Sequence, residues 1–308
     1  MAEYAGLAGV LGVLVAGFGL ATDHFFSPTT LRTIANQVPD ALLVATGMTF
    51  VIIAGGIDLS VGSVLALSSA VLGVALTEHH WPLPLAVASA VGTGLACGLL
   101  NGWLVTRWSL PSFIVTLGML EVARGGAYLV TGSQTMYLGR RIEELVQPIA
   151  GGLGLPVFLA AGAVLLGQFT IARTVFGRHL VAVGTNETAA NLSGVSPRPV
   201  RLATFVIAGT LAGIAAVVQG ARLAAADPNA GIGLELSAIA AVVIGGTTLA
   251  GGRGSVVSTM FGVLIIAVLG AGLAQLGVQE PTRRLVTGTV IIVAVVIDYY
   301  RSRRTRTA

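Results

Sequence analysis

Lysine is absent from this sequence of 308 residues, so its 17 basic residues are all arginine. A P-loop that binds ATP needs a lysine beside the phosphates, and Schiff-base catalysis needs a lysine amine. Both are therefore excluded for this chain. The single cysteine, Cys97, excludes an intrachain disulfide and a cluster of thiolate metal ligands.

Charge is also scarce. Charged residues make up 10% of the chain and hydrophobic residues 55%, whereas soluble domains carry about 25% charged residues. A mean hydropathy of +0.89 indicates that lipid is the main solvent, and we expect one membrane domain over residues 1–308. The pI is near 9.8, but the arginines are scattered between apolar runs. This distribution indicates a signal for membrane orientation and no nucleic-acid partner.

Ten apolar runs are long enough, or nearly so, to cross about 30 Å of hydrocarbon. Because backbone polar groups cannot face lipid unpaired, we expect an all-α polytopic fold of about ten transmembrane helices, some short or broken. The first run has no basic residue before it, unlike a secretory signal peptide, and we expect it to be retained. The runs cover residues 5–22, 38–54, 60–77, 83–105, 112–130, 155–171, 200–221, 234–249, 255–276 and 284–300.

Arginine clusters predict the orientation, because cytoplasmic connections carry an excess of basic residues. The tail after the last run and the connection after the sixth run are both rich in arginine, and an even number of runs separates them. Ten spans then place both termini in the cytoplasm of a multi-pass protein of the bacterial inner membrane. The connection 131–152 departs from this pattern, because it would lie outside yet contains Arg140 and Arg141.

Glycine is abundant, with 42 residues, and it recurs at helical spacing. Gly94, Gly98 and Gly102 lie four residues apart in one run, and Gly209 and Gly213 do so in another. Small residues at this spacing let helix backbones approach closely in lipid. The pattern therefore predicts a tightly packed bundle.

A short internal similarity links GGIDLSVGSV at 55–64 with GGTTLAGGRGSV at 245–256. Transporters often contain repeats whose helices are broken at matching places. The similarity is compatible with such a repeat, and equally with chance between two glycine-rich segments.

Asp58 lies between two uncharged stretches, 41–54 and 64–76, and shortly after two glycines that are expected to end the second run. In one interpretation, Asp58 or Ser60 accepts hydrogen bonds from the N–H groups that open the third run, where a negative charge also suits the helix dipole. In the other, a charged residue at membrane depth lines a polar pathway or a gate. The candidates for the substrate pathway or gate are Asp58, Ser60, Asn101, Gln219 and Glu235.

Glu121 and Arg124 are further charged residues within a run, and their spacing of three places them on one helix face. A lone charge at the centre of a membrane helix costs about 2.5–3.5 kcal/mol, so we expect a structural ion pair. The four histidines lie in connections, and none has the spacing of a metalloprotease. We expect no catalytic site and no metal site.

Three stretches together resemble one known family. They are GGIDLSVGSVLAL at 55–67, FGRHLVAVGTNETAANLSGV at 176–195 and ARLAAADPNAGIGLELSAIAAVVIGGTTLAGGRGS at 221–255. In combination and in this order they look like the permease subunit of ribose-type ABC sugar importers, and the resemblance covers most of residues 30–300. ETAANLSG at 187–194 is similar to the EAA–Gly cytoplasmic signature of ABC importer permeases, but Thr188 is an extra residue after the glutamate.

The resemblance implies a function and a set of partners. Such a permease pairs with a second copy or a paralogue in the lipid bilayer, and an extracytoplasmic binding protein delivers a sugar to it. A separate ABC ATPase subunit hydrolyses ATP with Mg, so that this chain binds no cofactor. The connection 174–197 would dock on the ATPase through Gly177, Arg178, Glu187, Ala189, Ala190 and Gly194.

Three other classes remain open at this point. An ion-coupled secondary transporter of a small polar solute is the main alternative, since broken glycine-containing helices and Asp58 suit it. It would need a site for a coupling ion, and few carboxylates lie within the runs. A membrane enzyme has no supporting nucleophile, base or metal cluster, and a structural scaffold would carry no solute.

Overall fold

The computed structural model describes residues 2–22 and 24–306, and helices dominate this part of the chain. Each of the ten predicted apolar runs contains a helix, which confirms the all-α polytopic class, although the helix in the run 234–249 ends at Ile244. The main helices are α1 (Ala2–Ala21), α2 (Pro28–Ile53), α3 (Val61–Thr77), α4 (Leu83–Trp108), α5 (Ser112–Thr131), α7 (Leu155–Arg173), α10 (Pro197–Leu223), α11 (Leu234–Ile244), α12 (Val256–Gln275) and α13 (Glu280–Arg306).

Seven of these helices are long and apolar enough to cross a membrane, namely α1, α2, α4, α5, α7, α10 and α12. Two others, α3 and α11, are apolar but shorter. Their lengths of 17 and 11 residues correspond to about 26 Å and 17 Å at 1.5 Å per residue. Neither helix alone spans about 30 Å of hydrocarbon, as expected for the short or broken members of the bundle.

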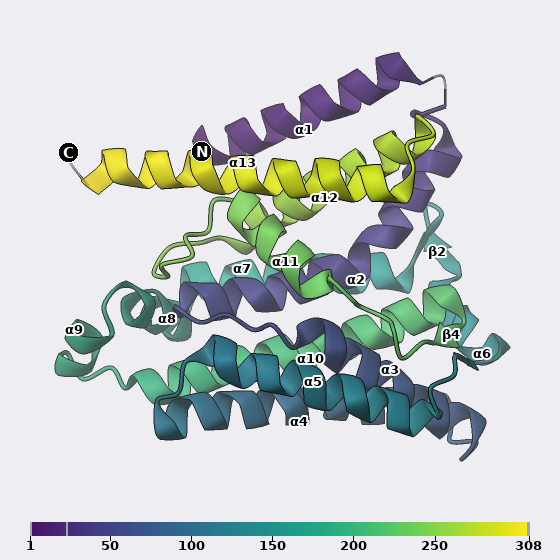
Figure 1. Ribbon diagram of the computed structural model, residues 1–308, viewed down its shortest axis with the longest axis horizontal. Helices are drawn as coiled ribbons and strands as arrows, with labels where there is room; N and C mark the ends of the chain where they lie inside the picture. Colours follow the sequence, from purple (N-terminus) through teal and green to yellow (C-terminus); the bar gives the residue numbers. More distant parts are fainter. Residues whose placement is uncertain (1, 23, 307–308) are drawn as a thin grey trace.

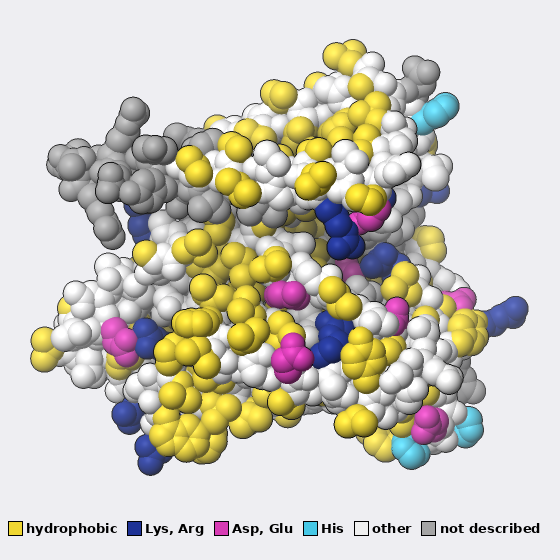
Figure 2. Space-filling view, viewed as in Figure 1, with side chains coloured by type: hydrophobic (Ala, Val, Ile, Leu, Met, Phe, Trp, Pro, Cys, Tyr) yellow, Lys and Arg dark blue, Asp and Glu magenta, His cyan; other side chains and the backbone are white. Residues whose placement is uncertain are grey.

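Helix α2 lies at the centre of the bundle. It packs against α7, α10, α11 and α12, and its residues from Val38 to Ile53 are almost all buried. A helix that is hydrophobic on all sides belongs in the core of a large protein. The helices around it, by contrast, present large apolar side chains outward, as a surface in contact with lipid requires; Figure 2 shows hydrophobic side chains over much of one face, with charged ones in small groups.

The two predicted glycine rows pack against each other. An added Cβ on Gly94 would overlap the Gly209 carbonyl oxygen, and one on Gly98 would come within 3.1 Å of the Gly209 Cα atom. α4 and α10 therefore touch backbone to backbone along this seam, which confirms the close packing that the spacing predicts.

The two ends of the bundle differ. At one end, α7 is followed by α8 (Val175–Thr185) and α9 (Glu187–Leu192); we call it the α9 end. At the other, the β1 end, β1 (Met136–Tyr137) pairs antiparallel with β4 (Ala225–Ala226). This end also holds α6 (Arg140–Glu143), the 3-10 turn Glu144–Val146, and the paired strands β2 (Pro148–Ala150) and β3 (Leu153–Gly154).

The start of α1 and the end of α13 both lie toward the α9 end (Figure 1). The structure thus agrees with placing the termini and the connection 174–197 at the same side of the bundle. Which side of the membrane that is stays a prediction from the arginine distribution.

Candidate functional site

The connection 174–197 folds into two short helices joined by one residue. Thr174 caps the start of α8 by accepting a hydrogen bond from the Gly177 N–H at 3.1 Å. Asn186 ends α8, where its N–H donates to the Ala182 carbonyl, and its side chain begins α9 by accepting from the Ala189 N–H at 2.9 Å. One residue thus ends α8 and caps α9, so the two helices follow each other without a flexible linker between them.

Helix α8 is anchored and α9 projects. Gly177 is buried against α7, and Leu180 and Val183 are buried in the main core, whereas Arg178 is exposed. In α9, Glu187 and Ala189 are exposed, and Glu187 forms an ion pair with Arg201 of α10 at 2.8 Å. Glu187 therefore holds α9 against the bundle, a role that the sequence did not indicate.

Ala190, one of the predicted docking residues, faces the protein interior. It is 5% exposed and belongs to the hydrophobic core, because the base of the projecting α9 turns one side toward the bundle. The exposed side carries Leu192, which is 83% exposed. Gly194 follows α9 with φ of +86°, and the Val195 N–H donates to the Ala190 carbonyl at 3.0 Å. This geometry is typical of a glycine that ends a helix.

Asp58, Ser60 and Asn101 form one buried network. Asp58 Oδ1 accepts the Ser60 N–H at 2.9 Å and the Ser60 hydroxyl at 2.6 Å, and Asn101 Nδ2 donates to Ser60 Oγ at 2.9 Å. Ser60 is the N-cap residue of α3, but its side chain accepts no bond from the helix amides. Asp58 thus fixes the residue before the helix and does not cap the helix amides themselves. The Asn101 Oδ1 atom is buried without a hydrogen-bond partner.

Side chains of α5 form hydrogen bonds with the backbone of the break between α2 and α3. Gly55 has φ of +77° where α2 ends, and the chain then continues outside any helix until α3 begins at Val61. Ser112 Oγ accepts the Ile57 N–H at 3.0 Å, and Thr116 Oγ1 accepts the Leu59 N–H at 3.1 Å. Side chains of α5 therefore satisfy two backbone donors of the α2–α3 break inside the protein, as a break at membrane depth requires.

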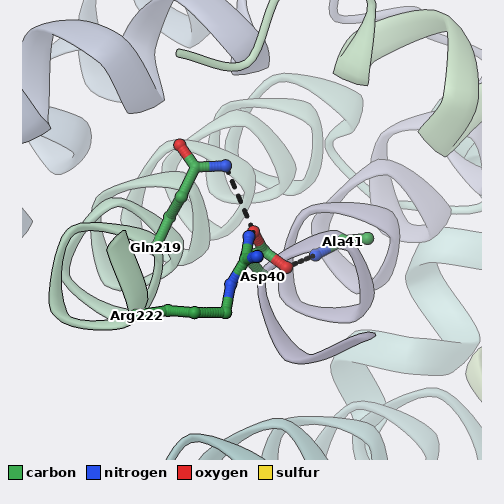
Figure 3. Close-up of polar contacts among 4 residues, drawn as sticks. All are labelled: Asp40, Ala41, Gln219 and Arg222. Carbon is green, nitrogen blue, oxygen red and sulfur yellow. Dashed lines mark hydrogen bonds and ion pairs between the residues drawn. The ribbon is translucent and has the colours of Figure 1, made fainter. Parts of the chain in front are cut away.

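Gln219 belongs to a different cluster, nearer the β1 end. Its Nε2 atom donates to Asp40 Oδ2 at 3.1 Å, and Arg222 Nη2 forms an ion pair with the same oxygen at 2.9 Å (Figure 3). Asp40 is 5% exposed and ties α2 to α10. The sequence analysis missed this pair. The signal was present, because Asp40 lies inside the second apolar run and Arg222 directly follows the seventh.

Arg124 forms no ion pair with Glu121 among the contacts that the structure describes, so that prediction is wrong. Its Nη1 atom instead donates to the carbonyl oxygens of Pro228 and Ala230, at 2.6 and 2.9 Å. These carbonyls belong to a run of turns between α10 and α11, outside any helix. The unpaired backbone of that segment competes successfully for the guanidinium.

Glu235 lies where two short helices begin. It stands in the first turn of α11, and its carboxylate lies so close to Gly62, in the first turn of α3, that an added Cβ there would overlap it. A second contact joins Gly62 to Gly231. The carboxylate is thus placed at the positive ends of both helices, where a negative charge is stabilised.

A cavity of about 500 Å³ lies between α2, α11 and α12. Its walls are largely apolar, and its polar lining includes Thr29, Thr33, Gln37, Ser237 and Gln275. Hydroxyl and amide groups can donate to and accept from a polyhydroxylated solute. None of the five predicted pathway residues lines this cavity; they divide instead between the buried network, the Asp40 cluster and the α3–α11 contact.

Comparison with known proteins agrees with this architecture. The family model described as "Branched-chain amino acid transport system / permease component" matches residues 30–295. The ribose import permease protein RbsC of Escherichia coli K12 is 36% identical over 293 residues, covering 93% of this chain and 90% of that protein. The Bacillus subtilis protein of the same name is 38% identical over 295 residues, covering 95% and 91%.

Another relative is the L-arabinose ABC transporter permease protein AraH of Azospirillum brasilense, 34% identical over 302 residues, covering 98% of this chain and 89% of that protein. These similarities favour the ABC permease interpretation over the secondary transporter. With its seven apolar helices, the chain is a multi-pass protein of the bacterial inner membrane. It belongs to the family of transport-system permease components that includes the ribose-type ABC importer permeases.

Proposed function

We propose that this chain is the membrane subunit through which an ABC importer moves a sugar, or a similar hydroxylated solute, into the cell. The observation that carries the proposal is the α8–α9 element. It combines an anchored helix with a short projecting one, at the end of the bundle where the arginine distribution predicts the cytoplasm. The relatives are named for ribose and L-arabinose, and others for fructose and D-allose.

An ATPase in a separate subunit is part of the proposal. The chain has no lysine and so no P-loop of its own, which means that ATP and Mg would be used by the partner. The exposed side of α9 is the proposed docking surface, and Leu192 is its large apolar residue. Its side chain is 83% exposed and is therefore free to contact a partner.

The binding protein would contact the β1 end, where the connection 131–152 and the segment after α10 lie together. A second copy of the chain, or a paralogue, would complete the membrane part. The polar groups of the cavity between α2, α11 and α12 support passage of a hydroxylated solute. The buried network of Asp58, Ser60 and Asn101 stays a candidate for a gate.

The test is purification of the tagged chain from its native membranes, followed by uptake in proteoliposomes. We expect an ABC ATPase to co-purify, and ATP together with the binding protein to drive uptake of one of ribose, L-arabinose, fructose or D-allose. A proton uncoupler should leave this uptake intact. Uptake that needs no ATP and disappears with the uncoupler would contradict the proposal.

A matched pair of variants tests the docking surface. Leu192→Asp should reduce ATPase co-purification, because the loss of an interface anchor costs about 2 kcal/mol or more, roughly a 30-fold weaker affinity. Leu276→Asp is the control, since Leu276 is a 47% exposed leucine that follows α12, the helix that runs away from the α9 end. Equal co-purification of both variants would remove α9 as the docking surface.

A further inference from the structure

Three segments that are distant in the sequence meet behind the α8–α9 element. They are the end of α2, the last turn of α8, and the loop between α11 and α12. The Gly252 N–H, in that loop, donates to the Ile53 carbonyl at the end of α2, at 2.9 Å. We call this contact the glycine junction, made of Ile53, Gly55, Gly184, Gly251 and Gly252.

The junction is mainly a contact of backbone with backbone. An added Cβ on Gly184 would overlap the Ile53 carbonyl oxygen and lie 2.6 Å from the Gly252 nitrogen. One on Gly251 would lie 2.9 Å from the Gly184 carbonyl oxygen and 3.0 Å from the Gly55 Cα atom. One on Gly252 would overlap the Thr185 hydroxyl and lie 2.8 Å from the Thr185 Cα atom, so the three segments have little room to move relative to one another.

The junction connects the element that would receive the ATPase to both breaks between helices. On one side, α8 is joined to α9 directly through Asn186. On the other, the chain passes from Gly55 through the Asp58 network into α3, and from Gly252 into α12. The two glycine-rich segments that resemble each other in sequence, 55–64 and 245–256, thus provide the two sides of one contact with α8.

We infer that the glycine junction is the point at which ATPase-driven movement of α8 and α9 passes to the two helix breaks. The inference rests on the proposed function. A shift of α8 toward the bundle must displace Ile53 and Gly252 together, because packed backbone segments move as a unit. The two helix breaks, which lead into α3 and α12, would therefore move in one step.

Gly184→Ala is the decisive variant. In an ordinary helix this change stabilises by about 1 kcal/mol, so any loss must come from the overlap with Ile53. Gly252→Asn adds bulk to the same contact from the other side, because its Cβ would lie 2.8 Å from the Thr185 Cα atom. Asparagine is enriched among residues with positive φ, which suits the φ of +76° at this position.

Two controls isolate the contact. Gly162→Ala is the control for Gly184→Ala, because Gly162 also lies within a helix, α7. Gly139→Asn is the control for Gly252→Asn, because Gly139 also has a positive φ, of +78°. An added Cβ meets nothing within 4 Å at either site. Each complex is purified from native membranes and assayed for folded yield, ATPase co-purification, ATP hydrolysis and uptake of the sugar that the wild-type complex imports. We expect both junction variants to keep the ATPase and to hydrolyse ATP, with uptake reduced at least tenfold, while both controls match the wild type.

The other outcomes overturn the inference. Uptake at the wild-type rate in the junction variants would mean that the contact carries no movement. Loss of the ATPase would place the defect in docking, and loss of folded protein in both variants would give the junction a structural role alone. Failure of the proposed function is a separate result, because it would appear in the wild-type chain as absence of a co-purifying ATPase or of ATP-driven uptake.

Discussion

Removing the Asp40 carboxylate should destabilise the bundle measurably. In Asp40→Leu, Arg222 and Gln219 of α10 lose the acceptor that they share, which lies 2.9 and 3.1 Å away (Figure 3). Breaking a buried ion pair from one side costs about 3–5 kcal/mol in soluble proteins, because a buried charge is left uncompensated. The cost here should be smaller, since the Arg222 side chain is 27% exposed.

Membrane bundles give a lower bound for the same change. Interhelical hydrogen bonds there average about 0.6 kcal/mol and reach about 1.7 kcal/mol, and Asp40 accepts one hydrogen bond and one ion pair from α10. We therefore expect a loss of about 2 kcal/mol. At about 2–4 °C for each kcal/mol in a protein of this size, Tm should fall by roughly 4–8 °C.

The assay is thermal unfolding in detergent, with tryptophan fluorescence as the readout. Asp40→Leu combined with Arg222→Met should regain most of the lost Tm, because apolar residues that replace both members of a buried pair are often neutral or stabilising. Glu280→Ala is the control: the Glu280 side chain is 54% exposed in its pairs with Arg283 and Arg284, and pairs at the surface contribute about 0–1 kcal/mol. A fall in Tm for Asp40→Leu no larger than for Glu280→Ala would refute the reasoning. So would a double variant that is less stable than either single one.

Two further predictions concern orientation and the buried network. An alkaline phosphatase fused at the C-terminus should be inactive, and one fused after Gly132 should be active, because the arginine-rich ends are predicted to be cytoplasmic; the opposite activities would invert the orientation. Asp58→Asn should keep folded yield and most transport, since an amide oxygen can still accept the Ser60 N–H, whereas Asp58→Leu should lower folded yield by leaving buried donors unpaired. Normal yield without transport in Asp58→Asn would instead show that the charge itself is required.

The sequence predicted the helices and their closest seam well. Long apolar runs and glycines at four-residue spacing are local patterns, and the structure realises them in α4 and α10. Gly55 also ends α2 near the predicted position, with φ of +77°. This could be predicted because glycine adopts positive φ without steric cost. Such features depend on neighbouring residues and not on the arrangement of the bundle.

The partners of polar residues could not be predicted in the same way. Arg124 was expected to pair with Glu121 on its own helix, but it binds backbone carbonyls of Pro228 and Ala230, about a hundred residues away. Gln219 was treated as a pathway residue, whereas it shares Asp40 with Arg222. A polar group in a membrane domain takes its partner from whatever the fold places beside it, and helix periodicity does not contain that information.

A single requirement explains where these partners lie. Backbone that leaves a helix inside the membrane must find its hydrogen bonds within the protein. Around the α2–α3 break, Ser112 and Thr116 of α5 accept the free N–H groups, and in the segment before α11 Arg124 donates to the free carbonyls. At the glycine junction the Gly252 N–H meets the Ile53 carbonyl directly. The bonds that make broken helices possible in this fold therefore also join the breaks to each other and to the helix that leads to α9, so that one arrangement satisfies the backbone and links the parts that would have to move together.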